Sequence, residues 1–172
     1  GLNVALIQDR PVLGGNGSSE VRVWPEGKTR QKPYAHIGEI VEELVPAKGP
    51  ADGNAKGAAI YADARKLDVV RAEPRIRLFT EQHVNGVEVR DGRIVAVIAQ
   101  HIRTARRLRF GAQLVADCTG DGTVGFLAGA DQGVSRDGVM GSSDRWDLMG
   151  AADPAQVLAC QAAWKDDAYC RE

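Results

Sequence analysis

The turn at residues 119–122 holds the side chains whose types and spacing most clearly suggest chemistry. Its sequence is Thr-Gly-Asp-Gly, and it follows an apolar run, residues 114–117, that predicts a short buried strand. Small and apolar residues from Val124 to Ala130 predict a short helix packed closely on a sheet. A strand, a glycine turn and a helix direct free backbone N–H groups toward an anion or a polar cofactor tail. The carboxylate of Asp121 instead suits the hydroxyls of a sugar or polyol, and an ordinary strand-to-helix connection is the alternative.

A glycine-rich loop after the first apolar run is the second candidate segment. Residues 2–8 form this run and predict a buried strand of a parallel sheet, which ends at the polar Gln8 and Asp9. Glycines occupy three of the four positions 14–17, so the backbone can adopt positive φ and approach a ligand closely. Asn16 and the serine hydroxyls after it add donors for a pyrophosphate. The loop therefore favours a ligand-binding connection, although glycine-rich loops also occur without a ligand.

Length and composition indicate a soluble globular chain of ordinary character. A chain of 172 residues is long enough for one domain with a real core. A net charge of −1 gives no argument for nucleic acid or an anionic membrane surface, and no apolar run approaches the ~20 residues of a membrane span. The three cysteines show no C-x-x-C spacing, which argues against a disulfide framework and against a zinc site. We expect a cytoplasmic protein with a small-molecule substrate and without metal, nucleic-acid or membrane partners.

Periodicity predicts two helices followed by a series of strands. The helices cover residues 35–45 and 58–72, and a loop rich in glycine and proline separates them. Asp91-Gly92 predicts a two-residue type I′ hairpin turn inside a three-stranded antiparallel meander. A further helix is expected to begin at Asp153-Pro154. Strands are predicted at residues 20–24 (or an extended arm), 76–80, 83–90, 94–102 and 106–110.

The two candidate segments, in this order of elements, resemble FAD-dependent oxidoreductases of the glutathione-reductase-like superfamily. The likeness rests on LVADCTGDGTVGFLAGAD and VALIQDRPVLGGNGSSEVRVW and covers roughly residues 2–131. The resemblance implies an α/β, Rossmann-like FAD/NAD(P)-binding fold, with the antiparallel meander inserted before the T-G-D strand. It assigns residues 1–131 to an FAD-binding domain and residues 132–172 to the start of a following segment or substrate domain.

The resemblance also implies which residues contact FAD. In the family, the Asp of the T-G-D turn accepts a hydrogen bond from the ribityl chain, and this role falls on Asp121. The end of the strand at residues 2–8 holds the adenosine ribose, and there Gln8 stands where a Glu is common. A strand residue that touches adenine through its backbone corresponds to Val84. The full set of implied cofactor-binding residues is Gln8, Asp9, Arg10, Gly14, Gly15, Asn16, Ser19, Val84, Thr119, Gly120 and Asp121.

The sequence departs from the family pattern at its beginning. In relatives with two dinucleotide motifs, the strand at residues 2–8 follows a first strand, a G-x-G-x-x-G turn and a helix. None of these appears before Leu2, so we expect the chain to be a fragment of a longer reading frame, its Rossmann-like fold incomplete.

The sequence is consistent with three functions. The leading hypothesis is the FAD-binding portion of an oxidoreductase that transfers electrons between an organic substrate and FAD, with no residue identified as acid, base or nucleophile. A truncated remnant that folds without cofactor is the second, since the first glycine turn is missing. A module that binds a nicotinamide or adenine nucleotide is the third, and the T-G-D turn favours FAD over it.

Overall fold

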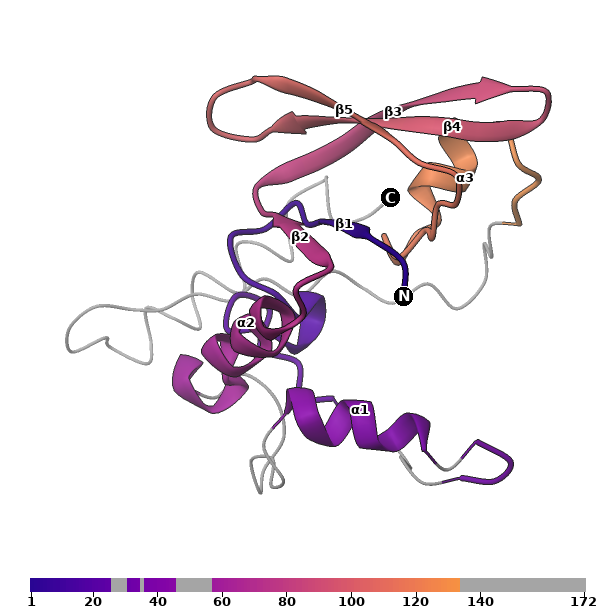
Figure 1. The fold of residues 1–172 in the computed structure, drawn as a ribbon. Helices are drawn as coiled ribbons and strands as arrows, with labels where there is room; N and C mark the ends of the chain where they lie inside the picture. The colour runs from indigo at the N-terminus through magenta and orange to yellow at the C-terminus, as the bar shows by residue number, and fades with distance from the viewer. Residues whose placement is uncertain (26–30, 35, 46–56, 134–172) are drawn as a thin grey trace, which may run out of the picture. The chain divides into compact units, whose positions relative to one another are not determined.

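The computed structural model describes residues 1–25, 31–34, 36–45 and 57–133 (Figure 1). The chain divides into two units, Gly1–Gln132 and Gly133–Glu172. The predicted helix at Asp153 lies outside the described residues. No helix in the described part of the chain is long and apolar enough to cross a bilayer. The elements in chain order are β1 (Val4–Ile7), η1 (Gly15–Gly17), α1 (Ile37–Leu44), η2 (Ala58–Tyr61), α2 (Asp63–Ala72), β2 (Ile76–Phe79), β3 (Gln82–Arg90), β4 (Arg93–His101), β5 (Arg107–Gly111) and α3 (Thr123–Leu127).

The first apolar run forms β1, which pairs in parallel with β2 so that Val4 lies opposite Ile76. A parallel pair needs a long crossover connection, and here the connection contains α1 and α2. This arrangement confirms the predicted α/β class. The strand is not buried as predicted, because β2 is its only partner among the described residues and Val4 remains 42% exposed.

The crossover contains one helix as predicted and one that is broken. Helix α1 confirms the helix predicted at residues 35–45. The single helix predicted at residues 58–72 is wrong, because Ala62 adopts a left-handed conformation with φ 50° and ψ 48°. A left-handed residue cannot continue a right-handed helix. The segment therefore becomes the 3₁₀ turn η2 followed by α2.

Strands β3, β4 and β5 form the predicted antiparallel meander, with β4 in the centre (Figure 1). Asp91 and Gly92 connect β3 to β4 with φ of 50° and 71°. Positive φ at both central positions is what a type I′ turn requires, so the predicted turn is confirmed. The central strand holds the buried side chains of Ala96, Val97 and Ala99.

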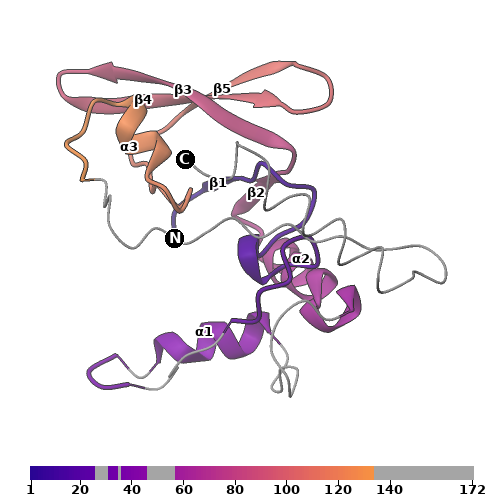
Figure 2. The same ribbon diagram turned by 180° about the vertical axis from the view of Figure 1, so that it is seen from behind.

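Buried apolar side chains gather in two places. Helix α3 contacts β3, and Val124 of α3 is buried (Figure 2). Leu13 and Tyr61 are buried where the glycine-rich loop meets η2 and α2. The rings of Phe79 and Phe110 meet edge to face with centroids 4.8 Å apart, so the end of β2 contacts β5. Each candidate segment thus adjoins a buried apolar side chain, Leu13 before the glycine-rich loop and Val124 after the T-G-D turn.

Two predicted strands are absent from the structure. Residues 114–117 pair with no strand among the described residues, and Leu114 is 78% exposed. A strand is held by ladder hydrogen bonds to a neighbour, so an apolar run without one gains neither the ladder nor cover. Residues 20–24 turn instead of forming a strand or an extended arm, since Arg22 has φ 62° and its N–H donates to the carbonyl of Ser18 at 2.8 Å.

Candidate functional site

Asp117 holds the T-G-D turn together. Its Oδ1 accepts hydrogen bonds from the backbone N–H of Thr119 at 3.0 Å and from the Thr119 hydroxyl at 2.7 Å. Its Oδ2 accepts from the backbone N–H of Gly125 at 2.9 Å, which ties the turn to α3. Thr119 Oγ1 also accepts from the N–H of Thr123 at 2.9 Å. Thr119 therefore shapes the turn and has little hydrogen-bonding capacity left for a ligand.

The same hydrogen bonds keep Asp117 ionised. The Thr119 hydroxyl, and then the backbone N–H of Gly125, lower the pKa of the Asp117 carboxyl below its ordinary value. Both donors stabilise the charged form of the acid. The base of the turn is therefore a fixed carboxylate at neutral pH.

Asp121 projects from this turn and is exposed. It stands between Gly120 and Gly122, whose backbones are left-handed with φ of 89° and 66°. A Cβ added at either glycine would meet nothing within 4 Å, so the surroundings are open. Within the described residues, the Asp121 carboxylate has no hydrogen bond or ion pair. It can accept hydrogen bonds from an approaching ligand.

The glycine-rich loop adopts the predicted positive φ at two positions. Gly14 has φ 113° and Gly15 has φ 53°. A 3₁₀ turn follows, in which the N–H of Gly17 donates to the carbonyl of Gly14 at 2.9 Å. Ser18 is fully buried, and its hydroxyl donates to the carbonyl of Gly15 at 2.7 Å. The loop is a defined structure because its own polar groups close it.

Residues of η2 and α2 bind the loop from one side. The Tyr61 hydroxyl donates to the carbonyl of Arg22 at 2.5 Å. The Asp63 carboxylate accepts from the N–H of Ser19 at 3.1 and 3.3 Å. The backbone N–H of Ser19 is therefore used inside the protein, which leaves its hydroxyl for a ligand.

Lys66 is a buried cation beneath the loop. Its ammonium donates to the carbonyl of Tyr61 and lies 3.9 Å from Asp63 Oδ1. Burial lowers the pKa of Lys66 from its ordinary value, and the Asp63 carboxylate opposes that shift. A Cβ at Gly14 would lie 2.9 Å from the Lys66 side chain, so a larger residue at this position would displace the buried Lys66. A Cβ at Gly15 would meet nothing within 4 Å.

The end of β1 meets the start of β3. The carbonyl of Gln8 accepts from the N–H of Gln82 at 2.9 Å, and the carbonyl of Arg10 accepts from Glu81. The Gln8 side-chain amide donates to the carbonyl of Val12 at 3.3 Å, so its Oε1 can still act as an acceptor. Asp9 between them is exposed. The strand end therefore contacts the first residue of β3, and Val84 lies two residues further along the same strand.

The predicted residues form three local groups rather than one closed site. The strand end, the loop at residues 14–19 and the T-G-D turn each have their own supports, and no hydrogen bond joins the turn to the other two within the described ranges. Both the strand end and the turn border β3, through β1 and α3 respectively. Arg10 at the strand end also pairs with Glu20 across the loop at 3.2 Å.

Sequence reasoning missed three residues at these groups. Asp117 precedes Thr119 by two positions, and this Asx-turn spacing could have identified it. Asp63 contacts a residue 44 positions away, and no local pattern reports such a contact. Gln82 is 6% exposed, and its Oε1 has no hydrogen-bond partner among the described residues. The backbone N–H of the same residue donates to the carbonyl of Gln8, so Gln82 adjoins the strand end.

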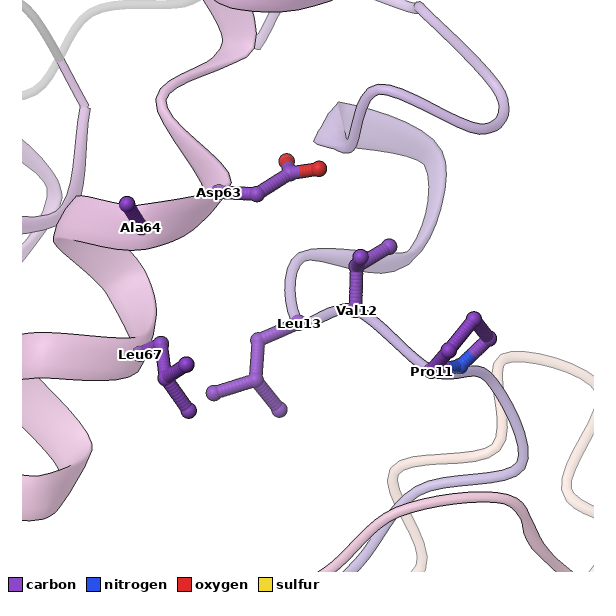
Figure 3. A pocket seen from close by; sticks show the side chains of 6 residues that line it. All are labelled: Pro11, Val12, Leu13, Asp63, Ala64 and Leu67. Carbon is purple, nitrogen blue, oxygen red and sulfur yellow. The ribbon is translucent and has the colours of Figure 1, made fainter.

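A small cavity lies between residues 11–13, just before the loop, and α2. It has a volume of about 90 Å³, and Figure 3 shows Leu13 and Leu67 pointing toward each other across it. Ligand pockets usually measure roughly 300–1,000 Å³, so this cavity is a packing gap and not a dinucleotide site. Its lining residues are Pro11, Val12, Leu13, Asp63, Ala64 and Leu67.

The chain was compared with curated proteins and with sequence models of protein families. No curated protein matches the chain. The sequence model of the family described as FAD dependent oxidoreductase matches residues 1–167. This match spans the strand end, the glycine-rich loop and the T-G-D turn. The chain therefore belongs to the FAD-dependent oxidoreductase family, a family of flavoproteins whose cofactor is FAD.

Proposed function

We propose that the strand end, the loop and the T-G-D turn bind FAD in an enzyme that transfers electrons between an organic substrate and the flavin. The isoalloxazine ring supplies the redox chemistry when FAD is bound, and the protein supplies binding and orientation. The observation that carries this proposal is the exposed Asp121 carboxylate in a turn that Asp117 already holds in shape. Such an acceptor suits a ribityl hydroxyl, because a hydrogen bond to a charged group is stronger than a neutral one.

The groups at the strand end suit the adenosine part of FAD. Gln8 Oε1 and the exposed Asp9 carboxylate can accept hydrogen bonds from ribose hydroxyls. The backbone N–H of Gln82 donates to the carbonyl of Gln8, and the buried Gln82 Oε1 has no donor among the described residues. An unpaired buried acceptor destabilises the protein. Val84 follows on the same strand, and its backbone is our proposed adenine contact.

The glycine-rich loop offers its outer side to the cofactor. Gly15 borders open space, and Asn16 is exposed with an amide that can donate to phosphate oxygens. The Ser19 hydroxyl is a further donor. Gly14 instead packs on Lys66, so its part in binding is to let the loop lie close to α2.

A cytoplasmic location is part of the proposal. Cys118 is exposed and carries a free thiol. Free thiols are maintained in reducing compartments, which supports this location.

The test is the identity of the molecule that the purified protein retains. The protein should show the visible absorption bands of flavin, and denaturation should release a compound with the mass of FAD. Addition of a candidate organic substrate without oxygen should bleach the bands if electrons pass to the flavin. A protein that stays colourless after incubation with FAD, or that retains NAD instead, would contradict the proposal.

A further inference from the structure

The segment at residues 61–66 binds the C-terminal end of the glycine-rich loop and the turn that follows it. Tyr61 donates its hydroxyl proton to the carbonyl of Arg22 at 2.5 Å. Asp63 accepts from the N–H of Ser19 with both carboxylate oxygens, at 3.1 and 3.3 Å. The two contacts come from residues on either side of the left-handed Ala62, which separates η2 from α2. Asp63 therefore binds the last residue of the loop, and Tyr61 binds the chain three residues further on.

The loop has an inner and an outer side. The inner side carries the buried Leu13 and Ser18 and the N–H of Ser19 that Asp63 binds. Figure 3 shows the Asp63 carboxylate pointing from α2 toward the loop. The outer side carries Gly15, with open space at its Cβ position, and the exposed Asn16. The contacts with α2 therefore leave the outer side free for a ligand.

Lys66 lies beside Asp63 and packs under Gly14, so it contacts both the segment and the loop. The side chain is 5% exposed, and its ammonium lies 3.9 Å from Asp63 Oδ1. The same ammonium donates to the carbonyl of Tyr61, so it fixes the segment that carries both contacts. Its carbon chain fills the space that a Cβ at Gly14 would need. Asp63 is thus a partnered carboxylate at the junction of loop and helix.

We propose that Asp63 is a positioning residue for FAD, which acts by holding the N–H of Ser19 so that the loop is already in its binding conformation. The inference rests on the proposed function. A loop that is ordered before binding loses less conformational entropy when the ligand arrives, and the affinity rises accordingly. Asp63 itself faces the inner side of the loop, so it acts through the loop and not by contact with the cofactor.

The experiment measures FAD affinity and loop protection in the purified protein stripped of flavin. Asp63→Ala removes both acceptor oxygens, and we expect its Kd for FAD to rise about tenfold. Asp63→Asn keeps one acceptor oxygen, so it should recover most of the affinity. Asp68→Ala changes an exposed carboxylate of the same helix and is the matched control. Hydrogen exchange at the Ser19 amide should become faster in Asp63→Ala and stay unchanged in Asp68→Ala.

Each outcome has one meaning because Asp121→Ala is measured beside these variants. If Asp121→Ala weakens FAD binding while Asp63→Ala does not, the positioning role is wrong and the proposed function stands. If neither variant weakens binding, the inference fails and the T-G-D turn does not hold FAD, whereas a protein that binds no FAD at all contradicts the proposed function itself. Should Asp63→Ala not fold, Asp63→Glu replaces it, since it keeps the negative charge beside Lys66 but moves the carboxylate oxygens away from the N–H of Ser19. Faster exchange of the Ser19 amide in Asp63→Glu with a Kd equal to that of the unchanged protein would then overturn the inference.

Discussion

Replacement of Asp117 by Ala should loosen the T-G-D turn and lower the stability of the protein. The carboxylate accepts three hydrogen bonds, two from Thr119 and one from the N–H of Gly125. Each hydrogen bond to a charged group contributes about 1.5–3 kcal/mol when it is buried, and exposure to water reduces that figure. Removal of an Asp that caps backbone N–H groups costs about 0.5–2 kcal/mol. We therefore expect a loss of about 1–2 kcal/mol, because Asp117 is exposed.

The contribution of Asp117 should depend on pH in a defined direction. Its pKa is lowered in the folded protein, so the unfolded chain binds a proton at a higher pH than the folded one. The stabilisation is therefore fully present above the ordinary carboxyl pKa of about 4 and is lost as the pH falls through the folded pKa. Asp117→Asn keeps one acceptor oxygen but cannot titrate. Its stability should change less between neutral and acidic pH than that of the unchanged protein.

Thermal unfolding at neutral and at acidic pH measures both effects. A loss of 1–2 kcal/mol corresponds to a decrease in Tm of roughly 2–8 °C for a chain of this size. Asp68→Ala removes an exposed carboxylate without a hydrogen bond among the described residues, so it controls for the loss of one charge. The reasoning is refuted if Asp117→Ala has the same Tm as the unchanged protein at neutral pH. It is also refuted if the Tm of Asp117→Asn falls with acid as much as the Tm of the unchanged protein does.

Two further predictions concern glycines. Gly92→Val should lower the free energy of unfolding by about 1–2 kcal/mol, because φ at this position is 71°. A Cβ here would meet no atom within 4 Å, so the loss comes from backbone conformation and not from a clash. Gly92→Asn, which tolerates this conformation, should melt close to the unchanged protein, and equal melting of both variants would refute the turn. Gly14→Ala should lower the Tm more than Gly15→Ala, since only the Cβ at Gly14 would lie 2.9 Å from Lys66. The reverse order in thermal melts would contradict the packing beneath the loop.

Features with a local cause could be predicted from the sequence. Asp91-Gly92 specifies its own backbone conformation, so the hairpin followed from two residues. The meander and α1 followed from periodicity in the same way. The glycines of the loop predicted positive φ because only glycine adopts it at little cost, and Gly14 and Gly15 do so.

Features set by distant contacts could not be predicted. The run at residues 114–117 has the composition of a strand, but composition does not supply the neighbour that a strand needs. The break at Ala62 interrupts a good helical pattern, and the ammonium of Lys66 donates to the carbonyl of Tyr61 across it. Residues 20–24 alternate like a strand, yet the turn at Arg22 brings its carbonyl to the Tyr61 hydroxyl. At residues 20–24 a tertiary hydrogen bond therefore accompanies the departure from local propensity.

The measurement that tests the central claim most directly is an FAD titration of the protein and of Asp121→Ala. A hydrogen bond from a ribityl hydroxyl to a carboxylate contributes about 1.5–3 kcal/mol. Its loss should raise the Kd for FAD roughly tenfold or more. Asp131→Ala, which removes a nearby exposed carboxylate, should leave the Kd unchanged. If Asp121→Ala and Asp131→Ala bind FAD as tightly as the unchanged protein, the T-G-D turn does not hold the cofactor.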